Sequence, residues 1–251
     1  MKNIGFIGIG VMGKSMAKNL LDAGYSINVY TRTKEKATEL IEKGAIWKQT
    51  IKDLALSSDV IITMVGYPTD VEEVYFGEDG ILENAQQGTY VIDMTTSKPS
   101  LATEIYHKAK EKDIYALDAP VSGGDIGAKN GTLAIMVGGD QDAFHQVLPI
   151  LNVMGENIKL QGKAGAGQYT KLTNQITIAS NMIGVCEAIA FAKKAGLNPE
   201  KVLESISTGA AASFSLSNLA PRMLKEDYNP GFYVKHFIKD MTIDRKSTRL
   251  N

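Results

Sequence analysis

Apolar and amphipathic segments alternate through the first 160 or so residues of the chain. The nearly continuous apolar runs at 59–65 and 90–94 are typical of strands buried on both faces of a parallel sheet. The run at 26–30 alternates and is β-branched, which also favours a strand. We therefore predict strands near 4–7, 26–30, 46, 59–65, 90–94, 114–117, 133–137 and 158–160, and helices over 14–24, 34–43, 51–57, 100–112 and 140–154.

This strand–helix alternation predicts an α/β fold, a Rossmann-type and mostly parallel sheet with helices on both faces. The pattern changes after Gly162, because only helices are expected from Ala164 on. The first of them is long, apolar and ends near Ala195, and Gly196–Pro199 marks a stop and a restart. We predict a nucleotide-binding domain over 1–162 and an all-helical domain over 163–251.

The most apolar long segment is Thr177–Ala192, which is interrupted by Asn181 and Glu187. We interpret it as a buried helix and not as a membrane span. The single cysteine, Cys186, lies within it and is expected to be a small buried side chain. One cysteine excludes an internal disulfide and fits a reducing compartment.

The composition and net charge narrow the classes of partner that the protein is expected to bind. Hydrophobic residues at 44% and charged residues at 22% are ordinary for a soluble globular protein. The net charge of -1 provides no basic field for nucleic acid or an anionic membrane, so we expect neither as a partner. The N-terminus has no small-residue cleavage site of a secretion signal, and we predict a cytoplasmic protein.

A glycine motif joins the first strand to the first helix, in the arrangement G-x-G-x-x-G. Its first glycine permits a tight turn, its second lets a pyrophosphate approach bare backbone, and its third lets the helix pack closely on the strand. The anion would lie on the free N–H groups of the new helix. The alternative is a glycine-rich turn without a ligand. The predicted cofactor-binding residues here are Gly8, Ile9, Gly10, Val11, Met12 and Gly13.

The residues after the second strand bear on the choice of nucleotide. An NAD site places an acid there for the ribose hydroxyl, but this chain has Thr31, Arg32 and Thr33. A guanidinium and two hydroxyls suit a 2′-phosphate, so we favour NADP and leave NAD possible. The alternative is a solvated basic turn before the next helix. Val65, at the end of another parallel strand, is also expected to border the cofactor.

Candidates for catalysis are few. His107, His145 and His236 are scattered and pair with no other ligand at metal spacing, so no metal site is predicted. Lys171 and Asn174 are three residues apart and share one helical face, which continues through an apolar residue. A buried lysine with a lowered pKa suits proton transfer, whereas a lysine that snorkels from a helix start is equally compatible with the pattern.

Four ordered motifs resemble the β-hydroxyacid dehydrogenase family. They are FIGIGVMGKSMAKNLLDAG at 6–24, DAPVSGGDIGAKNGTLAIMVGG at 118–139, GAGQYTKLTNQ at 165–175 and FYVKHFIKDM at 232–241. The family includes 3-hydroxyisobutyrate dehydrogenases, tartronate semialdehyde reductases and glyoxylate/succinic semialdehyde reductases. The resemblance covers residues 1 to about 243.

The resemblance implies roles for individual residues. Lys171 matches the family's catalytic lysine, which protonates the carbonyl oxygen in reduction and takes the hydroxyl proton in oxidation. Ser122, Gly123 and Gly124 match the loop that holds the substrate carboxylate. Thr96 matches a threonine beside both nicotinamide and substrate.

Further roles implied by the resemblance involve the helical domain. Asn174 orients the lysine or binds substrate. Phe232 and Asp240 match residues that this domain brings over the site, and Lys239 lies next to them as a cofactor-binding residue. Because Lys171 and Ser122 are assigned to different domains, the substrate cleft is expected between the two.

Two departures from the family pattern stand out. Many relatives have Asn where this chain has Gln175, which puts substrate preference in doubt. From about residue 244 the sequence is polar and non-periodic, unlike the long helix of the relatives. We expect a truncated helical domain, although full-length relatives form homo-oligomers through it.

The resemblance thus predicts an NADP-preferring oxidoreductase for a small 3-hydroxy acid, its semialdehyde or a 2-oxo acid. One alternative is a dinucleotide-binding module without turnover. Another is a relative of 6-phosphogluconate dehydrogenase, which has the same lysine but a His in place of Asn174. A third is an imine reductase, a class that usually replaces the lysine.

Overall fold

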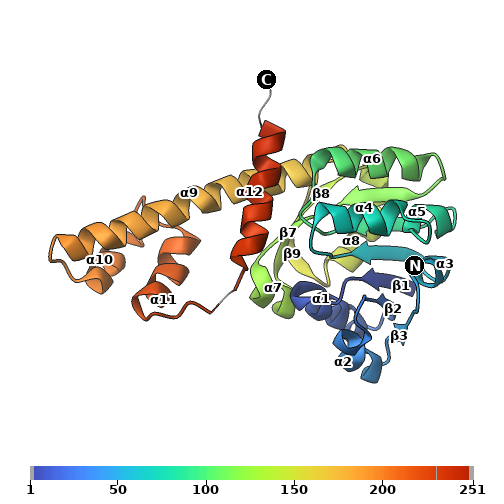
Figure 1. The fold of residues 1–251 in the computed structure, drawn as a ribbon, viewed down its shortest axis with the longest axis horizontal. Coiled ribbons are helices and arrows are strands. Elements are labelled where there is room, and N and C mark those ends of the chain that lie inside the picture. Colours follow the sequence, from blue (N-terminus) through green and yellow to red (C-terminus); the bar gives the residue numbers. More distant parts are fainter. Residues whose placement is uncertain (1–2, 230, 249–251) are drawn as a thin grey trace. The chain divides into compact units, whose positions relative to one another are not determined.

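A computed structural model describes residues 3–229 and 231–248 (Figure 1). The chain forms two compact units. The first holds the described residues up to Leu172 and from Val234 on, and the second is Thr173–Tyr233. The start of the long helix and the last helix belong to the first unit, and the domain boundary expected near residue 162 stays a prediction.

A single sheet organises the first unit and confirms the predicted α/β class. Its strand order is β3-β2-β1-β4-β5-β6-β8-β7, with β9 paired to β8. Pairing is parallel from β3 through β6 and between β8 and β9, whereas β8 is antiparallel to both β6 and β7. The strands are β1 (Asn3–Ile7), β2 (Ser26–Tyr30), β3 (Ile46–Trp47), β4 (Val60–Thr63), β5 (Tyr90–Asp93), β6 (Tyr115–Asp118), β7 (Val121–Ser122), β8 (Leu133–Gly138) and β9 (Gly155–Gly162).

Helices cover both faces of this sheet, as expected from its apolar strands. Successive strand residues point to opposite faces, so Phe6 and Ile62 join one core while Ile7 and Ile61 join the other. The helices on the first face are α1 (Val11–Asp22), α2 (Thr38–Glu42), α7 (Gly124–Asn130) and α8 (Gln141–Leu151), and those on the second are α3 (Ile51–Leu56), α4 (Pro68–Phe76), α5 (Ile81–Asn84) and α6 (Pro99–Lys110).

Several short elements were not predicted. Pro68 stands at the first position of α4, where a missing N–H costs nothing, so the break after β4 is also the start of a helix. The sequence also failed to indicate α5, α7 and β7. The predicted helix over 34–43 is divided into a 3₁₀ turn, η1 (Lys34–Ala37), and α2.

The second unit consists of helices: α10 (Pro199–Ile206), a π-helical segment η2 (Ser215–Leu219) and α11 (Ala220–Leu224), together with most of α9 (Ala166–Lys194). The restart after α9 is confirmed, since the Asn198 side chain caps α10 by accepting a 3.0 Å bond from the Lys201 N–H.

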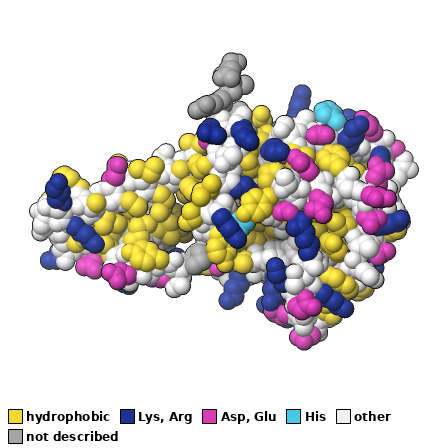
Figure 2. Space-filling model, viewed as in Figure 1, with side chains coloured by type: hydrophobic (Ala, Val, Ile, Leu, Met, Phe, Trp, Pro, Cys, Tyr) yellow, Lys and Arg dark blue, Asp and Glu magenta, His cyan; other side chains and the backbone are white. Residues whose placement is uncertain are grey.

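The prediction that the apolar part of α9 is buried is wrong. Only 17% of its most apolar stretch is covered, and by length and composition α9 could cross a membrane. Cys186, predicted to be buried, is exposed. The reason is that Val185 packs on α10, η2 and α11 on one side only, while Ile183 and Phe191 are 62% and 72% exposed. Hydrophobic side chains accordingly gather on the surface of these helices (Figure 2).

The last helix, α12 (Val234–Thr248), passes through residues where a non-periodic tail was expected. No Gly or Pro interrupts this stretch, and Ile243, 5% exposed, anchors it. The rest of the expected tail, residues 249–251, lies outside the described part.

Candidate active site

The glycine turn between β1 and α1 has the shape that dinucleotide binding requires. Gly8 has φ +99°, and a Cβ there would overlap the Met64 carbonyl. A Cβ on Gly13 would overlap the Gly8 carbonyl, whereas at Gly10 nothing lies within 4 Å. The first turn of α1 carries no acidic residue. The turn therefore fits phosphates that approach backbone at Gly10 and meet a helix N-terminus, and the assigned roles of its residues stay predictions.

The basic turn after β2 is paired with acids from α4. The exposed Arg32 donates from Nη2 to Asp70 Oδ1 at 2.8 Å and to Glu73 Oε2 at 2.7 Å. The Asp70 carboxylate raises the pKa of the guanidinium. Thr31 is half-buried and Thr33 is exposed. Neither acid was predicted from the sequence, because α4 was not expected, and the role of Arg32 toward a 2′-phosphate stays a prediction.

Lys171 lies in the first unit, near the start of α9, and is only 6% exposed. Burial lowers the pKa of its ammonium to about 8, while the nearby Asp240 carboxylate acts to raise that pKa and the Lys239 charge to lower it further. Of the two interpretations of Lys171, a buried lysine and a snorkelling one, the structure shows the buried lysine. Its amine is poised to gain or lose a proton near neutral pH.

The first half of α12 brings two more predicted residues, Lys239 and Asp240, close to Lys171. Lys239 donates from Nζ to the Thr96 carbonyl at 2.7 Å and lies 3.1 Å from Asp240 Oδ1. Asp240 is 1% exposed. The structure therefore groups Lys171, Lys239 and Asp240 electrostatically and joins Lys239 to Thr96, a residue far earlier in the chain.

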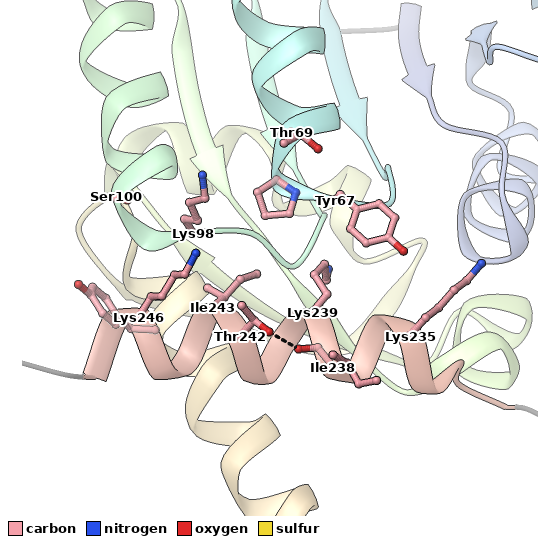
Figure 3. A pocket seen from close by; sticks show the side chains of 12 residues that line it. Tyr67, Thr69, Lys98, Ser100, Lys235, Ile238, Lys239, Thr242, Ile243 and Lys246 are labelled. Carbon is pink, nitrogen blue, oxygen red and sulfur yellow. Dashed lines mark hydrogen bonds between the residues drawn. The ribbon is translucent and has the colours of Figure 1, made fainter.

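A cavity of about 710 Å³ is lined by one face of α12, the beginnings of α4 and α6, and Tyr169 of α9 (Figure 3). Of the predicted site residues, Lys239 alone lines it. The cavity therefore borders the lysine group without containing Lys171 or the glycine turn.

The remaining predicted residues lie in several places. Ser122 is half-buried in β7, and Gly123 and Gly124 follow with φ +135° and +63°. Such positive values favour glycine, which explains the pair. In the second unit, the Asn174 amide donates to Gln175 Oε1 at 2.8 Å and Phe232 is 52% exposed. Their substrate-binding roles stay predictions.

A buried polar network behind Thr96 was missed. Asp93 Oδ1 accepts from Thr63 Oγ1 at 2.8 Å and from the Thr95 N–H at 3.1 Å. The Val65 N–H donates to Thr95 Oγ1 at 3.0 Å. Asp118 accepts from the N–H groups of Gly165 at 2.7 Å and Gln168 at 2.8 Å.

The two carboxylates of this network have unusual pKa values. Burial raises the pKa of Asp93 to about 6, and burial also raises that of Asp118. Asp93 and Asp118 are register partners at the ends of β5 and β6. An acid at the end of each of two adjacent apolar strands was the available signal, because carboxyl ends of parallel strands meet at one edge.

Within residues 3–229 and 231–248, no group of three or more His, Cys, Asp or Glu side chains is placed to hold an ion. His107 and His145 are exposed.

Two family models match nearly the whole chain. Residues 3–162 match the NAD-binding domain of 6-phosphogluconate dehydrogenase. Residues 165–249 match the NAD-binding segment of NADP-dependent 3-hydroxyisobutyrate dehydrogenase. The second match runs to residue 249, and the expected departure from the family pattern near residue 244 stays a prediction.

Individual relatives support the same family as the two family models. An oxidoreductase of Bacillus subtilis, YkwC, is 67% identical over 99% of this chain and 86% of its own length. The 2-hydroxy-3-oxopropionate reductase of Escherichia coli is 41% identical over 98% of this chain and 84% of its own. The structure of Mycobacterium tuberculosis 3-hydroxyisobutyrate dehydrogenase with L-serine superposes with a TM-score of 0.91 at 30% identity, covering 98% of this chain and 86% of that one. The chain therefore belongs to the β-hydroxyacid dehydrogenase family and is an NAD(P)-dependent oxidoreductase of the 3-hydroxyisobutyrate dehydrogenase type, acting on the CH–OH group of hydroxy acids.

Proposed function

We propose that this enzyme transfers hydride between NADP(H) and a small 3-hydroxy acid, its semialdehyde or a 2-oxo acid, with Lys171 as general acid and base. The observation that carries the proposal is the burial of Lys171 beside Asp240 and Lys239, with its pKa lowered to about 8. The bound nicotinamide supplies or accepts the hydride. In reduction, Lys171 gives the proton from Nζ to the carbonyl oxygen; in oxidation, the neutral amine removes the hydroxyl proton.

Other residues of the chain bind and orient. The Ser122–Gly124 loop is assigned to the substrate carboxylate through a hydroxyl and backbone N–H groups. Asp240, almost fully buried, stabilises the protonated form of Lys171 and so keeps a proton available at neutral pH. The names of the relatives favour substrates such as 3-hydroxyisobutyrate and 2-hydroxy-3-oxopropionate, and the bound L-serine of the mycobacterial structure fits the same class of small hydroxy acid.

The first test replaces Lys171 by Ala. We expect carbonyl reduction to fall by about 10²- to 10⁴-fold, the usual contribution of a positioned acid, with little change in NADPH affinity. The assay covers glyoxylate, succinic semialdehyde, tartronate semialdehyde and 3-hydroxyisobutyrate with both nucleotides. The matched control is Lys163→Ala, an exposed lysine close in sequence. Wild-type turnover in Lys171→Ala would remove the assigned role, and NADPH binding without turnover of any substrate would favour a binding module.

The pH dependence provides a second test. Because reduction needs the ammonium of Lys171, we expect its kcat/KM to fall as pH rises through about 8. Oxidation needs the neutral amine, so its kcat/KM is expected to rise through the same range. Both reactions are followed by kcat/KM, whose pH profile reports the pKa of the enzyme without bound substrate. Profiles that do not move in opposite directions would contradict the assignment.

The preference for NADP is proposed from Arg32. Its guanidinium already binds the carboxylates of Asp70 and Glu73 at 2.8 and 2.7 Å, so it is held near the end of β2 and can exchange them for a 2′-phosphate. Arg32→Ala should weaken the binding of NADPH by about 10-fold or more, which is the contribution of a charge-assisted hydrogen bond. The binding of NADH should change little. Asp70→Asn should favour NADPH instead, since a competing charge is removed. Titration of both nucleotides measures this, and equal losses for the two in Arg32→Ala would refute the role.

Assembly and location also belong to this proposal. A homo-oligomer is supported by the exposed apolar side chains Ile183 and Phe191 on α9. Light scattering tests it, and a monomer at micromolar concentration would contradict it. The cytoplasm remains the predicted location.

A further inference from the structure

Gln168 lies one helical turn before Lys171 in α9 and is fully buried. Its side-chain amide makes two bonds to the loop after β5. Nε2 donates to the Thr95 carbonyl at 2.7 Å, and Oε1 accepts from the Ser97 N–H at 2.9 Å. The amide therefore binds the backbone on both sides of Thr96, in the manner of a neighbouring strand.

The loop held by Gln168 has no helix or strand of its own between β5 and α6. Other parts of the first unit hold it too, through the bond of Asp93 to the Thr95 N–H and that of Lys239 to the Thr96 carbonyl. Of these contacts, only those of Gln168 come from the helix that carries Lys171.

Gln168 is itself held in place. Its backbone N–H donates to Asp118 Oδ2 at 2.8 Å, and the Gly165 N–H donates to the other oxygen of Asp118 at 2.7 Å. A side chain on Gly167 would overlap the Met136 carbonyl, so α9 begins pressed against the sheet. The connection runs without a gap from the end of β6, through the first turn of α9, to the Thr96 loop.

We propose that Gln168 is a positioning residue for hydride transfer: it fixes the Thr96 loop to the helix face that carries Lys171. Residues 168 and 171 are three apart and share that face. The inference rests on the proposed function, because it assumes that Lys171 and Thr96 meet the same substrate. A displacement of about 1 Å between groups that must act together can lower a rate about 100-fold. A purely structural amide would affect stability alone.

The test is Gln168→Met, which keeps the length and loses both bonds. We measure the single-turnover rate of hydride transfer from NADPH absorbance, with the carbonyl substrate that the wild type reduces fastest, well below the melting temperature. We expect the rate to fall about 10- to 100-fold, with the NADPH dissociation constant within about twofold of the wild type, a range typical of a change that leaves binding intact. Gln86→Met is the control, because Gln86 also bonds backbone through its amide, to Leu56 at 3.1 Å, away from this network.

The outcomes separate the inference from the proposed function. A wild-type hydride-transfer rate in folded Gln168→Met overturns the inference. If that variant does not fold, Gln168→Glu decides in the same assay, since its carboxylate keeps the bond from Ser97 and loses the one to Thr95. An unchanged rate in Lys171→Ala refutes the proposed function instead. Loss of turnover in Lys171→Ala together with a wild-type rate in Gln168→Met refutes the positioning role alone.

Discussion

The two units of this enzyme differ in where they place polar and apolar side chains. The first unit buries polar and charged side chains, among them Asp93, Asp118 and Gln168. The second exposes apolar ones, such as Phe191 and Phe214, each 72% exposed, around a small core of Val185, Leu203, Leu216 and Ala220. Helix α9 takes part in both, with a polar buried start and an apolar exposed continuation.

This difference distinguishes side chains that stabilise the fold from side chains that support the site. The first unit has two large apolar clusters, one on each face of its sheet, and a buried carboxylate is costly unless its partners satisfy it. Its buried polar groups are therefore explained by the site they support. The second unit has few buried side chains, so its stability is expected to depend on each of them. Three measurements test this contrast.

The largest effect is expected from Asp118→Ala. The change leaves the N–H groups of Gly165 and Gln168 buried without their acceptor. Bonds to a charged acceptor contribute about 1.5–3 kcal/mol each, so we expect the free energy of unfolding to fall by about 3 kcal/mol or more. Urea denaturation measures it. Asp118→Asn keeps one oxygen as an acceptor and should lose less stability. Equal losses in the two variants would show that the carboxylate stabilises the fold in another way than by accepting these two bonds.

A comparable effect, confined to a pH range, is expected from Asp93→Asn. The folded pKa of Asp93 is about 6, above its ordinary 3.8, so the wild type loses stability as pH rises from about 4 to about 6. At about 1.4 kcal/mol per unit, the loss is on the order of 3 kcal/mol. Asn keeps an acceptor for Thr63 and Thr95 but cannot ionise. The variant should match the wild type near pH 4 and exceed its stability at pH 7; a parallel pH profile would contradict this.

The smallest effects compare two apolar residues of the second unit. Leu203→Ala opens its small core and should lower the stability of that unit by about 2 kcal/mol or more. Phe191→Ser, on the exposed face of α9, should stay within about 0.5 kcal/mol in the isolated chain. Amide hydrogen exchange in α10 reports both changes. A cost for Phe191→Ser as large as that for Leu203→Ala in the oligomer would place this face in the proposed subunit contact, whereas the same cost in dilute monomer would contradict its exposure.

The sequence predicted the parts whose signals are local. The strands near β1, β2, β4 and β5, the glycine turn and the stop before α10 follow from short-range rules of burial and backbone geometry. The exposure of Cys186 could not be predicted, because apolar periodicity does not say which face of a helix finds a partner. The network of Asp93, Asp118 and Gln168 depends on register between strands and on a helix start far away in sequence.

The same limit applies to the site itself. The burial of Lys171 was one of two interpretations from periodicity, whereas the roles of Ser122, Thr96 and Asp240 came only from the resemblance to a family. What no pattern indicated was the pairing of Arg32 with Asp70 and Glu73, since α4 begins inside a segment that reads as a loop. Helix α4 shows that a proline after a strand can begin an element as well as end one.

The bond between Lys239 and the Thr96 carbonyl joins positions 143 residues apart. At about 5–20 residues per second of synthesis, roughly 7–30 s pass between the two leaving the ribosome. The growing chain can thus assemble its nucleotide-binding sheet well before α12 has been translated. Until α12 has been made, the Thr96 carbonyl lacks its bond from Lys239.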